Sequence, residues 1–356
     1  MAVLFESSLW SQPSNEAALA RVARYPRLRY MGSKYRVVPQ LLEVISGLEP
    51  RRVLDAFCGS GVVSYALKAN GVEVVANDFL NFAATIARAT TENSKVRLSE
   101  DHIEAMTSSR LDDRDFVRST FRGLYFPPED LAFIDGAWSH IDRLVGYDRD
   151  IAVASLCLAA ARKQPRGVFT ITDGRYDDGR RAMHTPLATL FAEGAREYNA
   201  AVFDNGRTSR ATCGDVFSVD PDGCDVVYLD PPYAPPRDDN DYIKRYHFLE
   251  GLATYWRGQE ILHNTITKKI RKRPTPFGSK RTIHDALRRT FERFNEQTLV
   301  LSYSSNSVPD EAAITELLKE ARREVVCYAV PHRYHFGTHS AATRRQANEL
   351  IFVASR

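Results

Sequence analysis

Cysteine is scarce in this sequence, and no two cysteines have a spacing that suggests a shared role. The 356-residue chain has five cysteines, an odd number, and none lies in a Cys-x-x-Cys pair. The sequence therefore predicts neither a disulfide framework nor a zinc site, and we expect no bound metal ion. Cys58 alone lies near a motif, and we interpret it as a small packed hydrophobic residue.

Long apolar runs are also missing. No stretch approaches the length of a membrane span, and residues 1–10, which include Glu6, lack the basic region and apolar core of an export signal. With 44% hydrophobic and 26% charged residues, the composition is that of an ordinary soluble globular protein. We therefore predict a cytoplasmic protein with no membrane partner.

The net charge is only +3, but basic residues are concentrated in one segment. Residues 268–281 contain seven lysines and arginines and no acid, and Pro274, Pro276 and Gly278 keep part of the segment from forming a helix. Such a run is more often a solvated loop, but its place after the motif described next favours phosphate contact. The candidate nucleic-acid-binding residues here are Lys268, Lys269, Arg271, Lys272 and Arg273.

The most informative stretch is an apolar run that ends at an acid and two prolines. Residues 226–229 predict a buried parallel strand, which stops at Asp230, Pro231, Pro232 and Tyr233. Consecutive prolines have no N–H, so the loop offers acceptors and no donors. An Asp carboxylate and a loop carbonyl can hold both N–H groups of a nucleobase amine and direct its lone pair at an electrophilic methyl group. Tyr233 would stack on the base, so these four residues are the candidate catalytic residues.

A strand, glycine loop and helix unit lies nearer the N-terminus. Residues 51–55 predict a strand that ends at Asp55, Gly59 and Gly61 form a Gly-x-Gly turn, and residues 62–69 predict a helix. This order is typical of the first crossover of a doubly wound α/β sheet, where glycines let a nucleoside cofactor approach the backbone. The third glycine of the dinucleotide fingerprint is absent, which disfavours NAD and leaves other adenosine cofactors open.

Two further predicted strands lead into acids. Residues 72–76 precede Asp78, about twenty residues after the glycines, where a ribose hydroxyl pair would be bound. The alternative for Asp78 is a helix N-cap. Residues 208–212 lead to Asp215, which is placed to accept a hydrogen bond from an adenine amine.

From about residue 95 to residue 200 the alternation of strand and helix lapses. Helical patterns there surround a polar loop, residues 172–181, that contains Arg175 and Arg180. We predict an N-terminal arm at 1–23, an α/β domain formed by 24–95 and 200–356, and a helical insertion at 96–199. Exposed loops on a rigid scaffold tend to do recognition, although a plain mobile connection fits equally well, and the two arginines are candidate nucleic-acid contacts.

Taken in order, these motifs resemble the D12-class DNA adenine-N6 methyltransferases, the Dam-type, α-group enzymes. The resemblance covers most of the chain beyond residue 24 and rests on Tyr30-Met31-Gly32-Ser33-Lys34, Asp55-Ala56-Phe57-Cys58-Gly59-Ser60-Gly61, Asn77-Asp78, Tyr125-Phe126-Pro127-Pro128-Glu129-Asp130, Asp230-Pro231-Pro232-Tyr233, Tyr246-His247-Phe248-Leu249-Glu250 and Leu301-Ser302-Tyr303-Ser304. The combination and its order are specific, whereas each piece alone is not.

The resemblance implies a Rossmann-like sheet of an S-adenosyl-L-methionine-dependent methyltransferase, with the helical insertion as target-recognition domain. The residues that it implies for the cofactor are Tyr30 and Lys34 at the methionine end, the loop of Asp55, Phe57, Gly59 and Gly61, Asp78 at the ribose, and Asp215 with Val216 at the adenine. It assigns residues 230–233 to the target base.

The resemblance also implies double-stranded DNA as the partner, with the adenine flipped out of the duplex. A restriction-modification or related defence system is the implied setting, with a cognate restriction endonuclease as a candidate second partner. Two other substrates use the same loop chemistry, an RNA adenine and the N4 of cytosine. A catalytically silent nucleic-acid-binding subunit is a further alternative, but the presence of Lys34, Asp78 and Asp230 together argues against it.

Overall fold

An eight-stranded sheet forms the centre of the computed structural model, which describes residues 3–4, 13–170, 177, 179–221, 223–232, 242–321, 324–333 and 346–356. The strand order is β1-β7-β8-β6-β5-β2-β3-β4, and every pairing is parallel except the two made by β8. The strands are β1 (Val3–Leu4), β2 (Arg52–Asp55), β3 (Glu73–Asp78), β4 (Arg210–Cys213), β5 (Val226–Leu229), β6 (Thr298–Ser304), β7 (Glu324–Arg333) and β8 (Gln346–Ser355).

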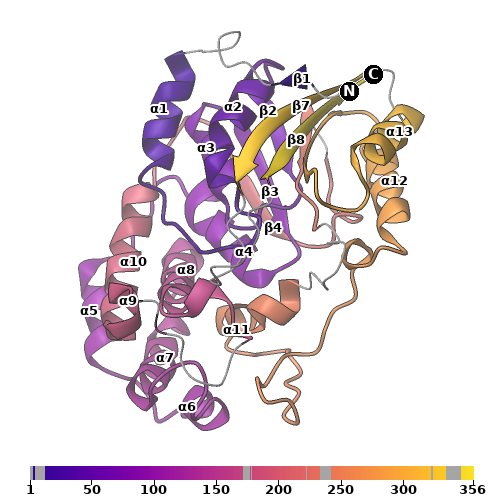
Figure 1. Cartoon of the computed structure of the whole chain (residues 1–356). Helices are drawn as coiled ribbons and strands as arrows, with labels where there is room; N and C mark the ends of the chain where they lie inside the picture. Colours follow the sequence, from indigo (N-terminus) through magenta and orange to yellow (C-terminus); the bar gives the residue numbers. More distant parts are fainter. Residues whose placement is uncertain are drawn as a thin grey trace.

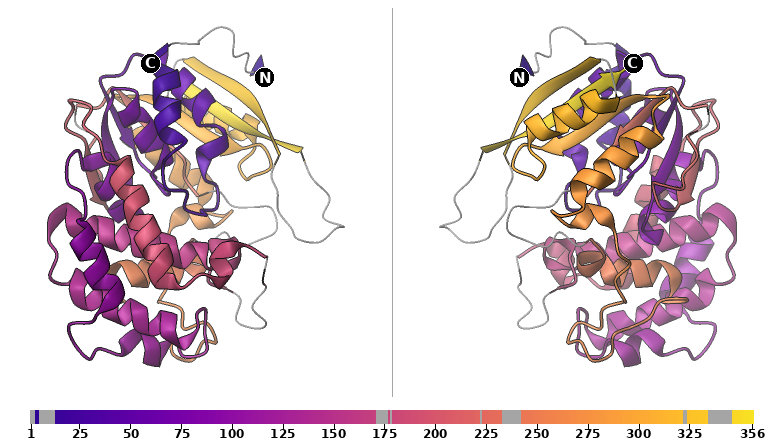
Figure 2. Two further views of the ribbon diagram at one scale, coloured as in Figure 1. Left: turned by 90° about the vertical axis from the view of Figure 1, so that its left-hand side faces the viewer. Right: turned by 90° about the vertical axis from the view of Figure 1, so that its right-hand side faces the viewer.

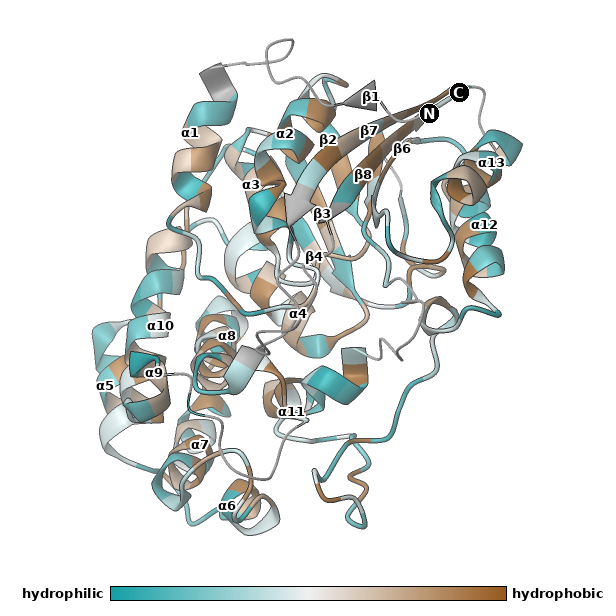
Figure 3. Cartoon of the chain, in the orientation of Figure 1, coloured by the Kyte–Doolittle hydropathy of each residue, from teal (hydrophilic) through white to brown (hydrophobic). Residues whose placement is uncertain are grey.

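Helices cover both faces of this sheet, so its central strands are apolar on both sides. In β5, Val226 and Tyr228 face one hydrophobic core, whereas Val227 and Leu229 face a second core on the opposite side. The first core includes α1 (Pro13–Val22), α2 (Val38–Ser46) and α3 (Val62–Ala69), and the second includes α12 (Ile283–Arg293) and α13 (Glu311–Ala321) (Figure 1). Figure 3 shows the hydrophobic colour along the central strands and hydrophilic colour on outward turns of α12.

Of the remaining helices, α4 (Asn81–Ala87) packs against β3 and β4, and the others lie beyond one edge of the sheet (Figures 1 and 2). They are α5 (Glu100–Ser108), α6 (Phe116–Thr120), α7 (Pro128–Ile141), α8 (Gly146–Arg162), α9 (Arg181–His184), α10 (Leu187–Ala201) and α11 (Tyr242–Thr254). We call α5 to α10 the helical unit. Its central helix, α8, is buried without a break from Ile151 to Ala161 and packs against α4, α10 and α11. In the described ranges, no helix is both long and apolar enough to span a membrane.

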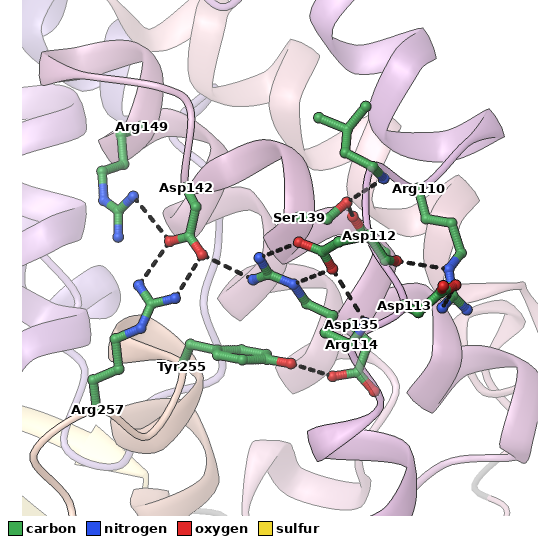
Figure 4. Close-up of polar contacts among 12 residues, drawn as sticks. Arg110, Asp112, Asp113, Arg114, Asp135, Ser139, Asp142, Arg149, Tyr255 and Arg257 are labelled. Atoms are coloured by element: carbon green, nitrogen blue, oxygen red, sulfur yellow. Dashed lines mark hydrogen bonds and ion pairs between the residues drawn. The ribbon is translucent and has the colours of Figure 1, made fainter.

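Residues that follow α11 are fastened to the helical unit by a polar network (Figure 4). Asp142, at the end of α7, forms ion pairs with Arg114, Arg149 and Arg257, and the Tyr255 hydroxyl donates to Asp135 at 2.5 Å. Hydrogen bonds from Arg257 and Arg114 lower the pKa of Asp142 to about 2. This carboxylate is therefore ionised at any physiological pH, and the network persists.

The predicted fold class, an α/β methyltransferase-type sheet with helices inserted between its strands, is confirmed. The helix expected at 62–69 has those bounds, and the strands expected at 51–55, 72–76, 208–212 and 226–229 occur within about two residues of those positions. The predicted division of the chain places α11 in the α/β domain, because α11 follows residue 200. In the structure it packs against α8 as well as against α4.

Candidate active site

A cavity lies where the direction of strand succession reverses. From β2 the chain continues outward to β3 and β4, whereas β5 lies on the other side of β2 and leads to β6. In doubly wound sheets this reversal leaves a crevice at the carboxyl ends of the strands. Here the crevice contains a cavity whose empty space, open solvent included, is about 1010 Å³. Its lining includes ten of the predicted residues: Tyr30, Lys34, Asp55, Phe57, Gly59, Asp78, Asp215, Val216, Asp230 and Pro232.

The other predicted residues of the strand-end loops have different positions. Gly61 begins α3 with φ of 76°, and a Cβ atom there would lie 2.5 Å from the Tyr25 hydroxyl, so this glycine accommodates a packed tyrosine. Pro231 is buried and is absent from the cavity lining. Tyr233 lies outside the described residues, as does Arg175.

Asp230 lies at the end of β5 and is held by a buried lysine. Lys34 Nζ donates to Asp230 Oδ1 at 2.6 Å and to the Gly32 carbonyl at 3.0 Å, and it lies 3.4 Å from Glu349 Oε1. The Lys34 side chain is 4% exposed and that of Asp230 is 18% exposed. Burial raises the pKa of Asp230 to about 6, although Lys34 acts in the opposite direction. One cation thus serves two carboxylates, one of which, Glu349 on β8, was not predicted from the sequence.

Asp55 contributes a carboxylate oxygen that lacks a partner. This fully buried side chain accepts a hydrogen bond from Ser64 Oγ at 2.5 Å through Oδ2, whereas Oδ1 has no hydrogen-bond partner among the described residues. Burial raises its pKa to about 7. A buried acceptor in a cavity wall is costly unless a donor reaches it, so Asp55 is suited to bind a cationic N–H group.

Asp78, at the end of β3, is tied to the glycine loop. Its Oδ2 accepts from the backbone N–H of Gly59 at 2.8 Å, and its Oδ1 accepts from the N–H of Leu80 at 2.9 Å. Burial raises its pKa to about 6, while these two backbone donors act to lower it. Gly59 has φ of 51°, and a Cβ there would lie 2.8 Å from a ring carbon of Tyr30. The loop therefore passes the Tyr30 ring at a distance that only glycine permits.

Two of the predicted residues, Tyr30 and Phe57, are each held by an aromatic partner to which the sequence analysis assigned no role. Tyr30 stacks on Tyr246 of α11, with ring centroids 4.9 Å apart, and the Tyr246 hydroxyl accepts from the Met31 N–H at 2.6 Å. Phe277 meets the edge of Phe57 at 5.3 Å. Phe277 belongs to a segment, Thr275 to Phe277, that lines the cavity and lies within the basic segment 268–281. The only sequence signal for Phe277 was its position in the basic segment.

The predicted nucleic-acid contacts lie outside the cavity lining. Residues 261–270 form a hairpin closed by an Ile261–Ile270 bridge, with Lys268 Nζ donating to the His263 carbonyl at 2.5 Å. Further contacts of the predicted set are Arg271 with Glu260, Arg273 with Glu250, and Arg180 with the carbonyls of Arg162 and Gln164. Lys269 is partly buried and Lys272 is exposed.

Comparison with known families shows the family to which the chain belongs. The family model of the D12 class N6 adenine-specific DNA methyltransferases matches residues 30–300, which span the glycine loop, the helical unit and the proline loop. The chain belongs to this family. The resemblance predicted from the motifs is thereby confirmed, together with the enzyme class.

Relatives of this D12 methyltransferase extend the likeness over nearly the whole chain. It is 27% identical over 350 residues to Type II methyltransferase M2.HphI of Haemophilus parahaemolyticus, covering 93% of this chain and 98% of the relative. It is 24% identical to modification methylase StsI of Streptococcus sanguinis and 23% identical to Type II methyltransferase M.FokI of Planomicrobium okeanokoites. Those alignments cover 92% and 91% of this chain, which spans only about half the length of each of the two relatives (52% and 51%).

The part of this D12 methyltransferase that the structure describes contains no group of three or more His, Cys, Asp or Glu side chains arranged to hold a metal ion. The acids of the cavity instead lie at the ends of separate strands, as Asp55, Asp78 and Asp230 do.

Proposed function

We propose that this chain transfers a methyl group from S-adenosyl-L-methionine to the N6 of an adenine flipped out of double-stranded DNA at a specific site. The observation that carries the proposal is the Asp230 carboxylate, held by Lys34 at the end of β5 on the wall of a cavity that buried acids surround. A carboxylate in that place is an acceptor for a base amine.

The residues of the cavity fit this cofactor. S-adenosyl-L-methionine, when bound, supplies a methyl group on a positively charged sulfonium. Asp55, with its unpartnered buried oxygen, is suited to the cofactor's ammonium group, and Gly59 leaves room for close approach to the loop. Asp78 would hold the ribose hydroxyls, and Asp215 with Val216 would meet the adenine. Four acids of the described lining, Asp55, Asp78, Asp215 and Asp230, against its one cation, Lys34, favour a cationic ligand.

The chain's own residues account for activation of the base. Asp230 accepts one N–H of the adenine amine and a carbonyl of the proline loop accepts the other, so the nitrogen lone pair is free to attack. Lys34 keeps the Asp230 carboxylate in place and favours its ionised form. Transfer is then a direct in-line displacement, for which positioning is the main requirement, and it involves no covalent enzyme intermediate.

DNA contacts are assigned to two places. The hairpin at 261–270, with Lys268 and Lys269, and the adjoining Arg271 and Lys272 supply charge for phosphates. The predicted insertion, residues 96–199, supplies target recognition, with Arg175 and Arg180 in its loop. The names of the relatives, Type II methyltransferases and a modification methylase, support a place in a restriction-modification system with a cognate endonuclease.

The test is to incubate the purified chain with methyl-labelled S-adenosyl-L-methionine and unmethylated genomic DNA, with total RNA in parallel, and to identify the labelled nucleoside after digestion. We expect label in N6-methyldeoxyadenosine, and mapping the modified positions gives the site. Label in RNA alone would identify RNA as the substrate. Label in N4-methyldeoxycytidine would identify the N4 of cytosine as the methylated position. Absence of label with cofactor still bound would favour a silent subunit.

Gly59→Ala is expected to weaken cofactor binding about tenfold. A Cβ at this position meets the Tyr30 ring at 2.8 Å, and φ of 51° is unfavourable for alanine. Either the loop or Tyr30 must shift, and both line the cavity. Calorimetric titration with S-adenosylhomocysteine measures the effect. Gly206→Ala is the matched control, because Gly206 also has positive φ but nothing lies within 4 Å of an added Cβ. Equal affinities for the two variants would contradict the assigned role of the loop.

Methyl transfer is expected to rise with pH through about pH 6. Burial raises the pKa of Asp230 to about 6, so below that pH the side chain is largely protonated and accepts N–H hydrogen bonds poorly. Single-turnover rates between about pH 5 and pH 8, with melting temperatures recorded in the same buffers, provide the measurement. A rate that stays constant across this range, in protein that remains folded, would exclude ionised Asp230 as the acceptor.

A further inference from the structure

An ion pair with a buried carboxylate joins three segments beside the cavity. Glu250 on α11 is fully buried, and its Oε1 accepts from Arg273 Nη2 at 2.5 Å and from Asn81 Nδ2 at 2.7 Å. Its Oε2 accepts from the Phe82 N–H at 3.4 Å. One carboxylate thus fastens the beginning of α4, α11 and the segment that contains Arg273 to one another.

The Arg273 guanidinium also contacts a wall of the cavity. It lies 4.3 Å from the centroid of the Phe79 ring, and Phe79 lines the cavity directly after Asp78. Arginine stacks on aromatic faces in this way because its planar cation is attracted to the ring. Arg273 therefore packs on a ring that lines the cavity.

Arg273 stands at the point where the basic run becomes part of the cavity. Two residues later the segment Thr275 to Phe277 lines the cavity, and Phe277 lies against the rings of Phe57 and Phe217. We call residues 273–277 the strap. The hydrogen bond to Glu250 and the contact with Phe79 hold its first residue, so its aromatic end has a defined position.

The charge balance explains why an arginine is needed. Burial raises the pKa of Glu250, whereas Asn81 and Arg273 act to lower it. Removing the cation leaves a buried carboxylate without compensation, which is strongly unfavourable. The Arg273 side chain is 39% exposed and its Nη2 is bound to Glu250, so its position differs from that of Arg271, which pairs with the exposed Glu260.

We propose that Arg273 is a positioning residue of the cofactor site, which fixes the strap and Phe79 as two walls of the cavity through Glu250. This assignment replaces the phosphate contact expected from the sequence, and it rests on the proposed function for the identity of the cofactor. Because Arg273 acts through Phe79 and the strap, its loss should affect cofactor affinity and KM more than the rate of transfer at saturation.

The test compares Arg273→Gln with Arg271→Gln, two residues away, by calorimetric titration of the full chain with S-adenosylhomocysteine in the absence of DNA. We expect Arg273→Gln to raise Kd about tenfold and Arg271→Gln to leave it unchanged. Arg273→Lys should restore part of the affinity, because it keeps a cation for Glu250 but lacks the planar face for Phe79. Melting temperatures confirm that each variant is folded.

If Arg273→Gln does not fold, the double variant Glu250→Gln with Arg273→Gln removes the buried charge together with its partner, and the same rise in Kd is expected. An unchanged Kd for a folded Arg273 variant, with weaker DNA binding, would overturn the proposal and restore the phosphate contact. Failure of the wild-type chain to bind S-adenosylhomocysteine would overturn the proposed cofactor and this inference with it, so the two failures are distinguishable.

Discussion

Asp230→Ala is expected to reduce the single-turnover rate of methyl transfer by about a thousandfold or more while cofactor affinity stays near that of the wild type. The substitution removes the acceptor that holds the amine. The groups that we assign to the cofactor, Asp55 and Asp78, make their own hydrogen bonds with Ser64, Gly59 and Leu80 and do not depend on Asp230.

Rapid-quench measurement of the first turnover, together with titration of S-adenosylhomocysteine, separates these two effects. Asp285→Ala is a suitable control, because Asp285 is an exposed acid in the first turn of α12, away from the cavity lining. If Asp230→Ala abolished cofactor binding as well, the proline loop would belong to the cofactor site, and the target base would have to bind elsewhere.

Lys34→Met is expected to have the next largest effect, with a rate at pH 7 lower by about a hundredfold and a folding stability lower by about 3 kcal/mol. Lys34 is the cation shared by Asp230 and Glu349, at 2.6 Å and 3.4 Å. Lys34 lowers and Glu349 raises the pKa of Asp230, so loss of the lysine moves that pKa upward. The pH at which the rate rises should therefore shift above its wild-type value, and raising the pH should recover part of the activity.

The pH profile distinguishes this electrostatic role from simple loss of packing. In Lys34→Met, Asp230 and Glu349 both lose the Lys34 cation, and adding Glu349→Gln removes one of these two carboxylates. The double variant should therefore regain part of the stability, and the midpoint of its pH profile should be lower than that of Lys34→Met. A variant whose rate is low at every pH, with an unshifted midpoint, would indicate that Lys34 instead contacts the cofactor or the base directly.

Local signals made much of this fold predictable. The strand at 226–229 and its stop at Asp230 follow from a short apolar run and two prolines, and the glycine turn predicts the first crossover. Parallel strands bring their carboxyl ends to one edge of a sheet, so Asp55, Asp78 and Asp230 had to meet once the strands were assigned.

Residues that reach the site through long-range packing left no comparable signal. Glu349 lies in an ordinary strand, and its contact with Lys34 arises because antiparallel β8 runs between β6 and β7. Tyr246 and Glu250 belong to a motif that carried the resemblance, but no role could be assigned to them, because their contacts arise only where α11 packs against α4 and against Tyr30. Gly61 is the opposite case, a residue that was predicted for the cofactor site but packs elsewhere. The spacing of a glycine turn does not indicate which glycine faces a ligand and which accommodates Tyr25.

The shared carboxylate Asp142 has a consequence for how such an enzyme acquires a new specificity. Arg257 and Tyr255 are encoded after the proline loop, yet they are partners of Asp142 and Asp135 in the helical unit. A chimera that exchanged residues 96–199 alone would remove these partners and leave the exposed Arg257 without its ion pair to Asp142. An exchange of the helical unit should therefore include residues 255–257, whereas substitutions on the exposed surface of the unit leave the junction intact.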